Sequence, residues 1–346
     1  MNKVFILSTL VTTGLLTGCQ ATDSVNSENA AIYQQTEALS QPVYQIEAQF
    51  AHQLAQESKA LHQGFQHACQ GKQTLESVRL QWQQTARAWM ALQGQQRGPA
   101  QAIEKSWQIQ FWPDKKNTTG RQMSALLRQS EPVTVAQIGA GSVATQGIGA
   151  LEWLLYDSAS PIETSAACHL GETISENLYV QSQAIAKAWQ QNPWQELDAN
   201  TWRNEYVALL SNQLEFSVSK LNRPLAEIGK PRPYFAESWR SGQSMANIKA
   251  NVSALFQLYM ADGHGLDHDL RASGHADIAD RMVNEFQLIM QTWPEDLTLF
   301  TDISSREGYR AVLLQKNKLE QLHYLLHDEA AVALGVIVGF NATDGD

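Results

Sequence analysis

One acidic side chain, Glu152, lies within an otherwise apolar stretch of the sequence, residues 147–156. The stretch reads GIGALEWLLY, a composition that is typical of a buried helix. A carboxylate is almost never fully buried unless it is paired, protonated or bound to a cation. Glu152 is therefore the first candidate for binding or catalytic chemistry, and its partners must come from other parts of the chain.

Arg240 is a candidate partner in a loop that is rich in proline and polar residues, residues 231–244. Three serines surround it in this loop: Ser238, Ser241 and Ser244. Arg240 could hold an anion or orient Glu152, or it could be a loop arginine that is bonded to backbone carbonyls. We expect Ser238 and Arg240 to line the same site.

Trp112 is a further candidate, because it precedes Pro113, and proline must end or kink the helix before it. A tryptophan beside a helix break usually packs around the bend. The wall of a ligand site is its less common use.

The sequence carries no HExxH motif, no pair of CxxC motifs and no calcium-loop pattern. His264 and His268 lie four residues apart, with Asp267 between them. If this segment is helical, the two imidazoles share a face and are weak metal candidates together with Asp267. Gly263 and Gly265 favour instead a turn or a helix N-terminus, where acidic residues are common anyway.

The N-terminus resembles the signal peptide of a bacterial lipoprotein. Lys3 supplies a positive charge, and residues 4–18 are apolar but too short to span a membrane as a mature helix. The small residues before Cys19 predict cleavage after residue 18 and lipidation of Cys19; an ordinary secretory signal is the alternative. By the same resemblance, Gln20 favours a lipid anchor in the outer membrane of a Gram-negative cell, with the protein facing the periplasm.

The two remaining cysteines, Cys69 and Cys168, are expected to pair as a disulfide, because export places them in an oxidising compartment. No activating partner for either thiol can be identified from the sequence, so a structural role is favoured over a catalytic one.

Apolar residues recur at helical spacing through most of the chain, and no sustained two-residue alternation is present. The pattern predicts an all-α protein made of two packed, four-helix-bundle-like units that form a bilobal body. Thr74 and the pair Ser304 and Glu307 are predicted to cap helices.

We expect four parts in the chain: a signal peptide (1–18), a flexible tether (19–40), an N-terminal bundle (41–170) and a C-terminal bundle (171–346). The formal net charge of −10 argues against nucleic acid as a partner.

Four segments together resemble the imelysin family. They are TQGIGALEWLLYD (Thr145–Asp157), FWPD (Phe111–Asp114), ESWRSGQSMANIKAN (Glu237–Asn251) and LGVIVGFNATDGD (Leu334–Asp346). The resemblance implies two helical bundles with the site in the groove between them, in an exported protein of the kind often associated with bacterial iron uptake. The family is named after a member described as an insulin-cleaving metallopeptidase, and some relatives are regarded as proteins that bind iron or another metal.

The family motif GxHxxE is altered here. Gly147 matches its glycine and Glu152 its glutamate, but Gly149 stands where the histidine belongs. Histidine and glutamate three residues apart on a helix can share a cation, whereas glycine supplies no ligand. A zinc peptidase needs about three protein ligands and a bound water, so we expect the loss of one ligand to cripple peptidase activity in this chain.

Three hypotheses follow for the function. The first is a lipoprotein that binds iron or an iron compound between the bundles and works with an iron-uptake receptor or another envelope protein. Glu152 would be its acidic anchor, since oxygen ligands suit ferric iron. The second is a metallopeptidase with a substitute ligand such as His264 or His268, and the third is a non-catalytic scaffold that binds a partner.

Overall fold

The structure, a computed structural model, describes residues 21–336, with side chains from Leu39 onwards. Within this range the backbone forms helices and no β-strand, which confirms the all-α class. The signal peptide, Cys19 and the last ten residues lie outside the described range.

The long helices are α1 (Ala21–Cys69), α2 (Leu75–Met90), α7 (Gly147–Tyr156), α8 (Ser165–Ala188), α9 (Ala199–Leu225), α10 (Ser244–Met260), α12 (Ala276–Gln291) and α14 (Arg306–Tyr324). The shorter helices are α3 (Ala100–Ile103), α4 (Ser106–Ile109), α5 (Thr118–Leu126), α6 (Val135–Ala140), α11 (Leu266–Ala272), α13 (Leu299–Asp302) and α15 (Ala331–Ala333). Single turns of 3-10 helix form η1 (Val143–Thr145), η2 (Pro233–Phe235) and η3 (Ala261–Gly263), and a π-helix forms η4 (Leu325–Ala330).

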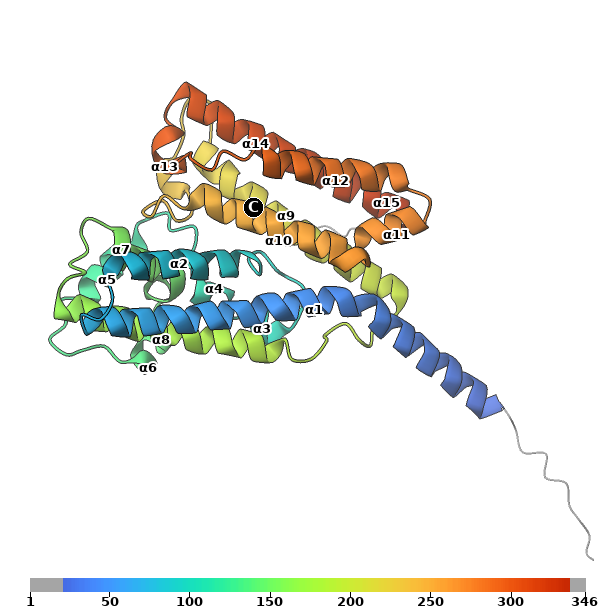
Figure 1. The fold of residues 1–346 in the computed structure, drawn as a ribbon, viewed down its shortest axis with the longest axis horizontal. Coiled ribbons are helices and arrows are strands. Elements are labelled where there is room, and N and C mark those ends of the chain that lie inside the picture. The colour runs from blue at the N-terminus through green and yellow to red at the C-terminus, as the bar shows by residue number, and fades with distance from the viewer. Residues whose placement is uncertain (1–20, 337–346) are drawn as a thin grey trace, which may run out of the picture.

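The first bundle consists of α1, α2, α7 and α8, with α3 to α6 packed around α7 and α8 (Figure 1). A disulfide joins Cys69, the last residue of α1, to Cys168 in the first turn of α8, with the Cα atoms 5.7 Å apart. Near the other end of α8, the ring of Tyr44 on α1 lies 6.5 Å from that of Trp189. The two helices are therefore antiparallel along their shared length.

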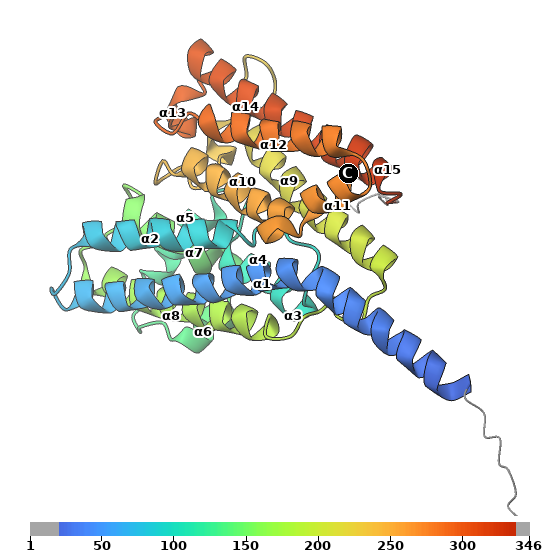
Figure 2. The same cartoon turned by 45° about the vertical axis from the view of Figure 1, so that its right-hand side comes forward.

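The second bundle consists of α9, α10, α12 and α14, with α11, α13 and α15 at its ends (Figure 2). The chain passes from the first bundle to the second between α8 and α9. The boundary that the sequence suggested, between residues 170 and 171, falls inside α8. Because α8 packs along α1, the whole of α8 belongs to the first bundle.

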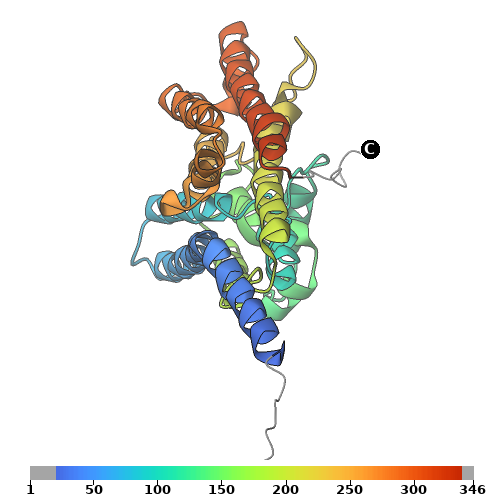
Figure 3. The same cartoon turned by 90° about the vertical axis from the view of Figure 1, so that its right-hand side faces the viewer.

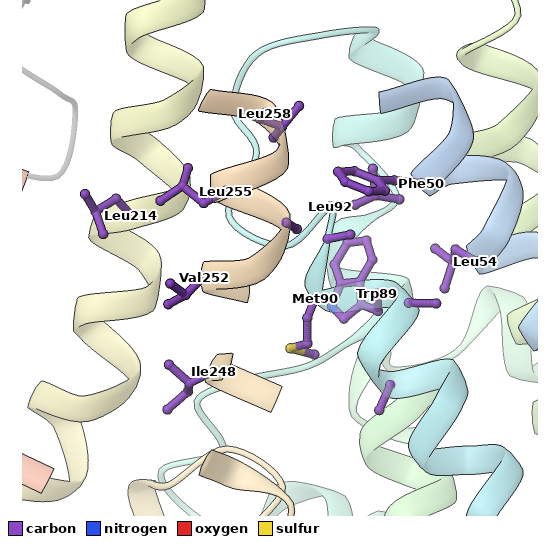
Figure 4. Close-up of a cluster of buried hydrophobic side chains, with 14 of the residues drawn as sticks. Phe50, Leu54, Trp89, Met90, Leu92, Leu214, Ile248, Val252, Leu255 and Leu258 are labelled. Atoms are coloured by element: carbon purple, nitrogen blue, oxygen red, sulfur yellow. The ribbon is translucent and has the colours of Figure 1, made fainter. Parts of the chain in front are cut away.

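The two bundles share one apolar core, and α2 lies against α10 where they meet (Figure 3). Figure 4 shows this junction: Phe50 and Leu54 of α1 and Trp89 of α2 lie on the side of α10 that faces the first bundle, whereas Val252 and Leu255 of α10 lie on its other side, towards α9. All five side chains are buried. Each buried apolar side chain of this size contributes roughly 1.5–3 kcal/mol, so burial favours a fixed contact between the bundles.

Local signals in the sequence account for several helix starts. The Thr74 side chain accepts a hydrogen bond from the Ser77 amide and caps α2, as predicted. The predicted cap at Ser304 is wrong by one residue: Ser305 accepts from the Gly308 amide and caps α14. Ser304 and Ser305 carry the same side chain, so the sequence alone does not show which of them is the N-cap. The backbone direction at the start of the helix selects Ser305.

Residues 21–40, suggested as a flexible tether, belong to α1. The segment contains neither glycine nor proline and is rich in alanine, glutamate and glutamine, which favour helix. Among the described helices, none is long and apolar enough to cross a membrane.

Candidate functional site

Helix α7, which carries Glu152, is fixed at its start by Gly147. This glycine has φ +65°, and a Cβ at this position would lie 2.0 Å from the Ile109 carbonyl oxygen. Only glycine accommodates both the left-handed backbone and the close approach. One residue further on, Trp82 Nε1 of α2 donates to the Ile148 carbonyl at 3.0 Å, so α7 is held on two sides.

Glu152 is 4% exposed, and its partner comes from the second bundle. Its Oε1 accepts hydrogen bonds from the Ser241 amide and the Ser241 hydroxyl, both at 2.9 Å. Burial raises the pKa of Glu152, whereas the Ser241 bonds and the charge of Arg240 act in the opposite direction. Glu152 therefore ties α7 to the loop between η2 and α10.

Arg240 makes a second connection between the bundles. Its Nε donates to Asp157 Oδ2 at 2.6 Å, and its Nη2 donates to Asn117 Oδ1 at 2.8 Å. The guanidinium also lies 4.3 Å from the centre of the Trp239 ring. Arg240 makes no hydrogen bond to Glu152. It is held close to Glu152 because the next residue, Ser241, is bonded to that carboxylate.

The loop that carries Arg240 rests on a buried polar network. Lys220 of α9 is fully buried and forms an ion pair with Glu237. Its ammonium also donates to Asn251 at 2.7 Å and to Gln93 at 2.9 Å, and Gln93 lies just after α2 in the first bundle. Burial lowers the pKa of Lys220, and the adjacent Glu237 carboxylate counteracts this. The network thus fixes the start of the 237–243 loop between the bundles.

Ser238 and Trp112 support the loop rather than face Glu152. Ser238 has φ +51°, and its Oγ accepts a bond from Asn247 at 3.0 Å. Trp112 Nε1 donates to the Phe235 carbonyl at 3.2 Å, which holds η2 against the first bundle.

A pocket of about 540 Å³ opens between the bundles beside these contacts, and we call it the inter-bundle pocket. Residues 114–117 and Asp157 line it from the first bundle, and residues 231–235, Trp239 and Arg240 line it from the second. Glu152 does not line it. Of the four predicted ligand-binding residues, only Arg240 reaches the pocket, while Glu152, Trp112 and Ser238 hold the loops that form its walls.

The position of the missing motif histidine, Gly149, is open. A Cβ there would meet only the Phe111 carbonyl oxygen, at 3.9 Å. No group of three or more histidine, cysteine, aspartate or glutamate side chains able to hold a metal ion occurs among the described residues. A tetrahedral zinc site needs about three protein ligands, so the residues around Glu152 do not fit a catalytic zinc ion.

The weak metal candidates lie elsewhere. His264 and His268 are exposed, with their ring centres 6.2 Å apart, and Asp267 accepts two bonds from Arg271. They follow the end of α10, whereas Ser241 precedes its start, and a helix of this length spans about 25 Å. The structure therefore does not bring these residues to Glu152.

Comparison with known proteins identifies the family. The imelysin family model matches residues 41–326. The chain belongs to the imelysin family. No curated protein matches it.

Two solved structures share the imelysin fold. An imelysin-like protein from Psychrobacter arcticum 273-4 aligns with a TM-score of 0.73 at 23% identity, over 88% of this chain and 96% of its own. A protein described as a "putative iron-regulated protein A precursor", from Parabacteroides distasonis ATCC 8503, aligns with a TM-score of 0.58 at 13% identity, over 84% and 95%.

The sequence did not predict two residues that organise the site, Ser241 and Lys220. Ser241, rather than Ser238, bonds Glu152, and both belong to the same polar loop. Lys220 reads as an ordinary surface lysine of a helix. Its one signal is that it follows Gln213 and Ser217 in steps of four and three, which places it on the same buried face of α9.

Proposed function

We propose that this imelysin-family chain is a non-catalytic binding protein of the cell envelope. It binds an anionic iron compound in the inter-bundle pocket. The observation that carries the proposal is the placement of Arg240, an arginine of the second bundle that is fixed by Asp157 and Asn117 of the first at the pocket wall.

The side chains around the pocket favour an iron compound over a bare ion. A bare ferric ion prefers several carboxylate oxygens. Both aspartates of the pocket are already engaged, Asp157 by Arg240 and Asp114 by the Thr118 and Thr119 amides. A chelate brings its own donors and presents anionic groups outward, and arginine is well suited to bind such groups.

Two further points support a role in iron uptake at the envelope. One structural relative is described as an iron-regulated protein. The lipoprotein-like N-terminus would anchor the mature chain to the outer membrane through lipidated Cys19, within reach of an iron-uptake receptor.

Calorimetric titration of the mature protein with ferric citrate tests the proposal. We expect binding to the wild type and a loss of about tenfold or more in Arg240→Gln, because one charge-assisted contact is removed and the pocket wall loosens. Glu152→Gln should weaken binding less, since Glu152 does not touch the ligand and only holds Ser241, the residue next to Arg240. Arg281→Gln, which removes an arginine of α12 that is paired with Glu329 and does not line the pocket, is the matched control and should bind normally.

Two results would contradict the proposal. One is the absence of binding by ferric citrate and by other anionic iron chelates. The other is chelator-sensitive cleavage of a peptide substrate by the purified protein, which would favour a metallopeptidase with ligands recruited from elsewhere.

A further inference from the structure

The rim of the inter-bundle pocket carries three positive side chains that form no ion pair within the described part of the chain. Lys115, Lys116 and Arg232 are exposed at the rim, and none forms an ion pair with a carboxylate of the described part of the chain. The whole chain has a net charge of −10. A cationic rim on an acidic protein favours an anion at this position.

The aspartates that line the same pocket do not cancel this charge. Asp114 accepts hydrogen bonds from the Thr118 and Thr119 amides, the first two of α5, at 2.7 and 2.9 Å. Asp157 is engaged by Arg240 at 2.6 Å and by the Ala159 amide at 2.9 Å. Both carboxylates keep their charge, but the lining holds four cationic side chains against these two, so the net charge at the rim is positive.

The second-bundle wall of the pocket is aromatic. The Trp239 ring stacks on Phe300 at 4.7 Å, and Tyr234 meets both rings edge to face at 5.1 and 5.0 Å. Tyr234 follows Pro231 and Pro233, which restrict the backbone. It is nevertheless 66% exposed. An aromatic ring held at a fixed position with most of its surface free is suited to stack against a flat ring of a ligand.

We propose that the inter-bundle pocket selects anions that contain an aromatic ring. The ring of the ligand lies against Tyr234, and its anionic groups contact Lys115, Lys116 and Arg232. The volume of about 540 Å³ lies within the range of small-molecule sites. This inference rests on the proposed function. It predicts that the pocket prefers iron chelates with an aromatic ring to chelates without one.

Two iron-free probes isolate the contribution of the ring. Citrate carries three carboxylates on a flexible chain, and trimesate carries three carboxylates on a benzene ring. In calorimetric titration, wild type should bind trimesate roughly twofold to tenfold more tightly than citrate, since an aromatic pair contributes about 0.5–1.5 kcal/mol. Tyr234→Ala should remove this preference, and Tyr234→Phe should keep it because the ring remains.

The charge is tested by the double variant Lys115→Glu and Lys116→Glu, which should weaken both probes about tenfold or more, and less so at high salt. The matched control is Lys59→Glu with Lys187→Glu. This pair makes the same charge change in a groove of about 920 Å³ between α1 and α8, and both probes should bind to it as to wild type.

Each outcome separates the inference from the proposed function. Equal affinity for trimesate and citrate, with Tyr234→Ala changing neither, overturns the aromatic preference; the proposed function then stands if ferric citrate binding still depends on Arg240. If trimesate binds through Tyr234 but no iron compound binds, the inference holds and the iron-related function fails. Failure of both iron-free probes to bind wild type overturns the inference.

Discussion

Glu152 and Glu47 are both buried carboxylates on helices of the first bundle, but their surroundings differ. Glu152 receives an amide and a hydroxyl from Ser241 of the opposite bundle, with Arg240 nearby. Glu47 of α1 receives a bond from the Gln95 side chain at one oxygen. Its other oxygen has no hydrogen-bond partner among the described residues.

The difference shows that burial alone does not identify a functional carboxylate. Burial raises the pKa of Glu47 to about 8, so it is mostly protonated at neutral pH and behaves as a neutral polar group of the core. Glu152 is instead bonded to the loop that places Arg240 at the pocket. The contribution of the opposite bundle therefore decides which of the two carboxylates serves the site.

Glu237, a third buried carboxylate, extends the comparison because it is paired with a buried cation. Glu237→Gln should lower the free energy of unfolding by about 3–5 kcal/mol, since the ammonium of Lys220 would stay buried without its partner. Urea denaturation measures this change. The double variant Lys220→Met with Glu237→Gln should recover most of the loss, because no unpaired charge remains. A single variant as stable as wild type would contradict a charged pair in the folded state.

Glu47 should give a smaller, pH-dependent effect. Its folded-state pKa of about 8 lies above the ordinary 4.5, so its stabilising contribution is complete below pH 4.5 and is lost as the pH rises towards 8. The loss is at most about 1.4 kcal/mol per pH unit. Glu47→Gln lacks this loss, and its unfolding free energy should exceed that of wild type by roughly 2–4 kcal/mol at pH 8.

Urea denaturation at pH 5, 6.5 and 8 measures the difference between Glu47→Gln and wild type, which should grow with pH. The control is Glu104→Gln, which removes the same charge at an exposed position. Its unfolding free energy should stay within about 0.5 kcal/mol of the wild-type value at all three pH values. A difference between Glu47→Gln and wild type that does not change with pH would show that Glu47 is not protonated by burial.

The sequence predicted the elements but not the partners of these carboxylates. Local features were predictable because they depend on the spacing of residue types along the sequence. They are the helical class, the cap at Thr74 and the apolar run around Glu152. The partners depend on how the loop at 237–243 turns. Ser238, at φ +51°, directs its side chain to Asn247, which leaves Ser241 to face α7. This orientation is not encoded in the neighbouring residues alone, and the burial of Lys220 is indicated in the sequence only by its spacing along α9.

The smallest expected effect concerns the residue one turn before Glu152. If the partners of Glu152 all come from the opposite bundle, the space beside it on α7 is available, and Gly149→Ala should be accepted. A Cβ there meets only the Phe111 carbonyl oxygen, at 3.9 Å, and alanine restricts the unfolded chain more than glycine does. We expect a gain of about 0.5–1 kcal/mol in the free energy of unfolding, measured by urea denaturation.

Gly147→Ala is the contrasting control on the same helix. It should cost more than Gly149→Ala gains, because a Cβ at Gly147 would lie 2.0 Å from the Ile109 carbonyl oxygen and alanine is strained at φ +65°. A loss of stability in Gly149→Ala would mean that another group fills the place of the motif histidine. Glu152 would then have a partner on its own side of the interface, and its contrast with Glu47 would no longer depend on Ser241.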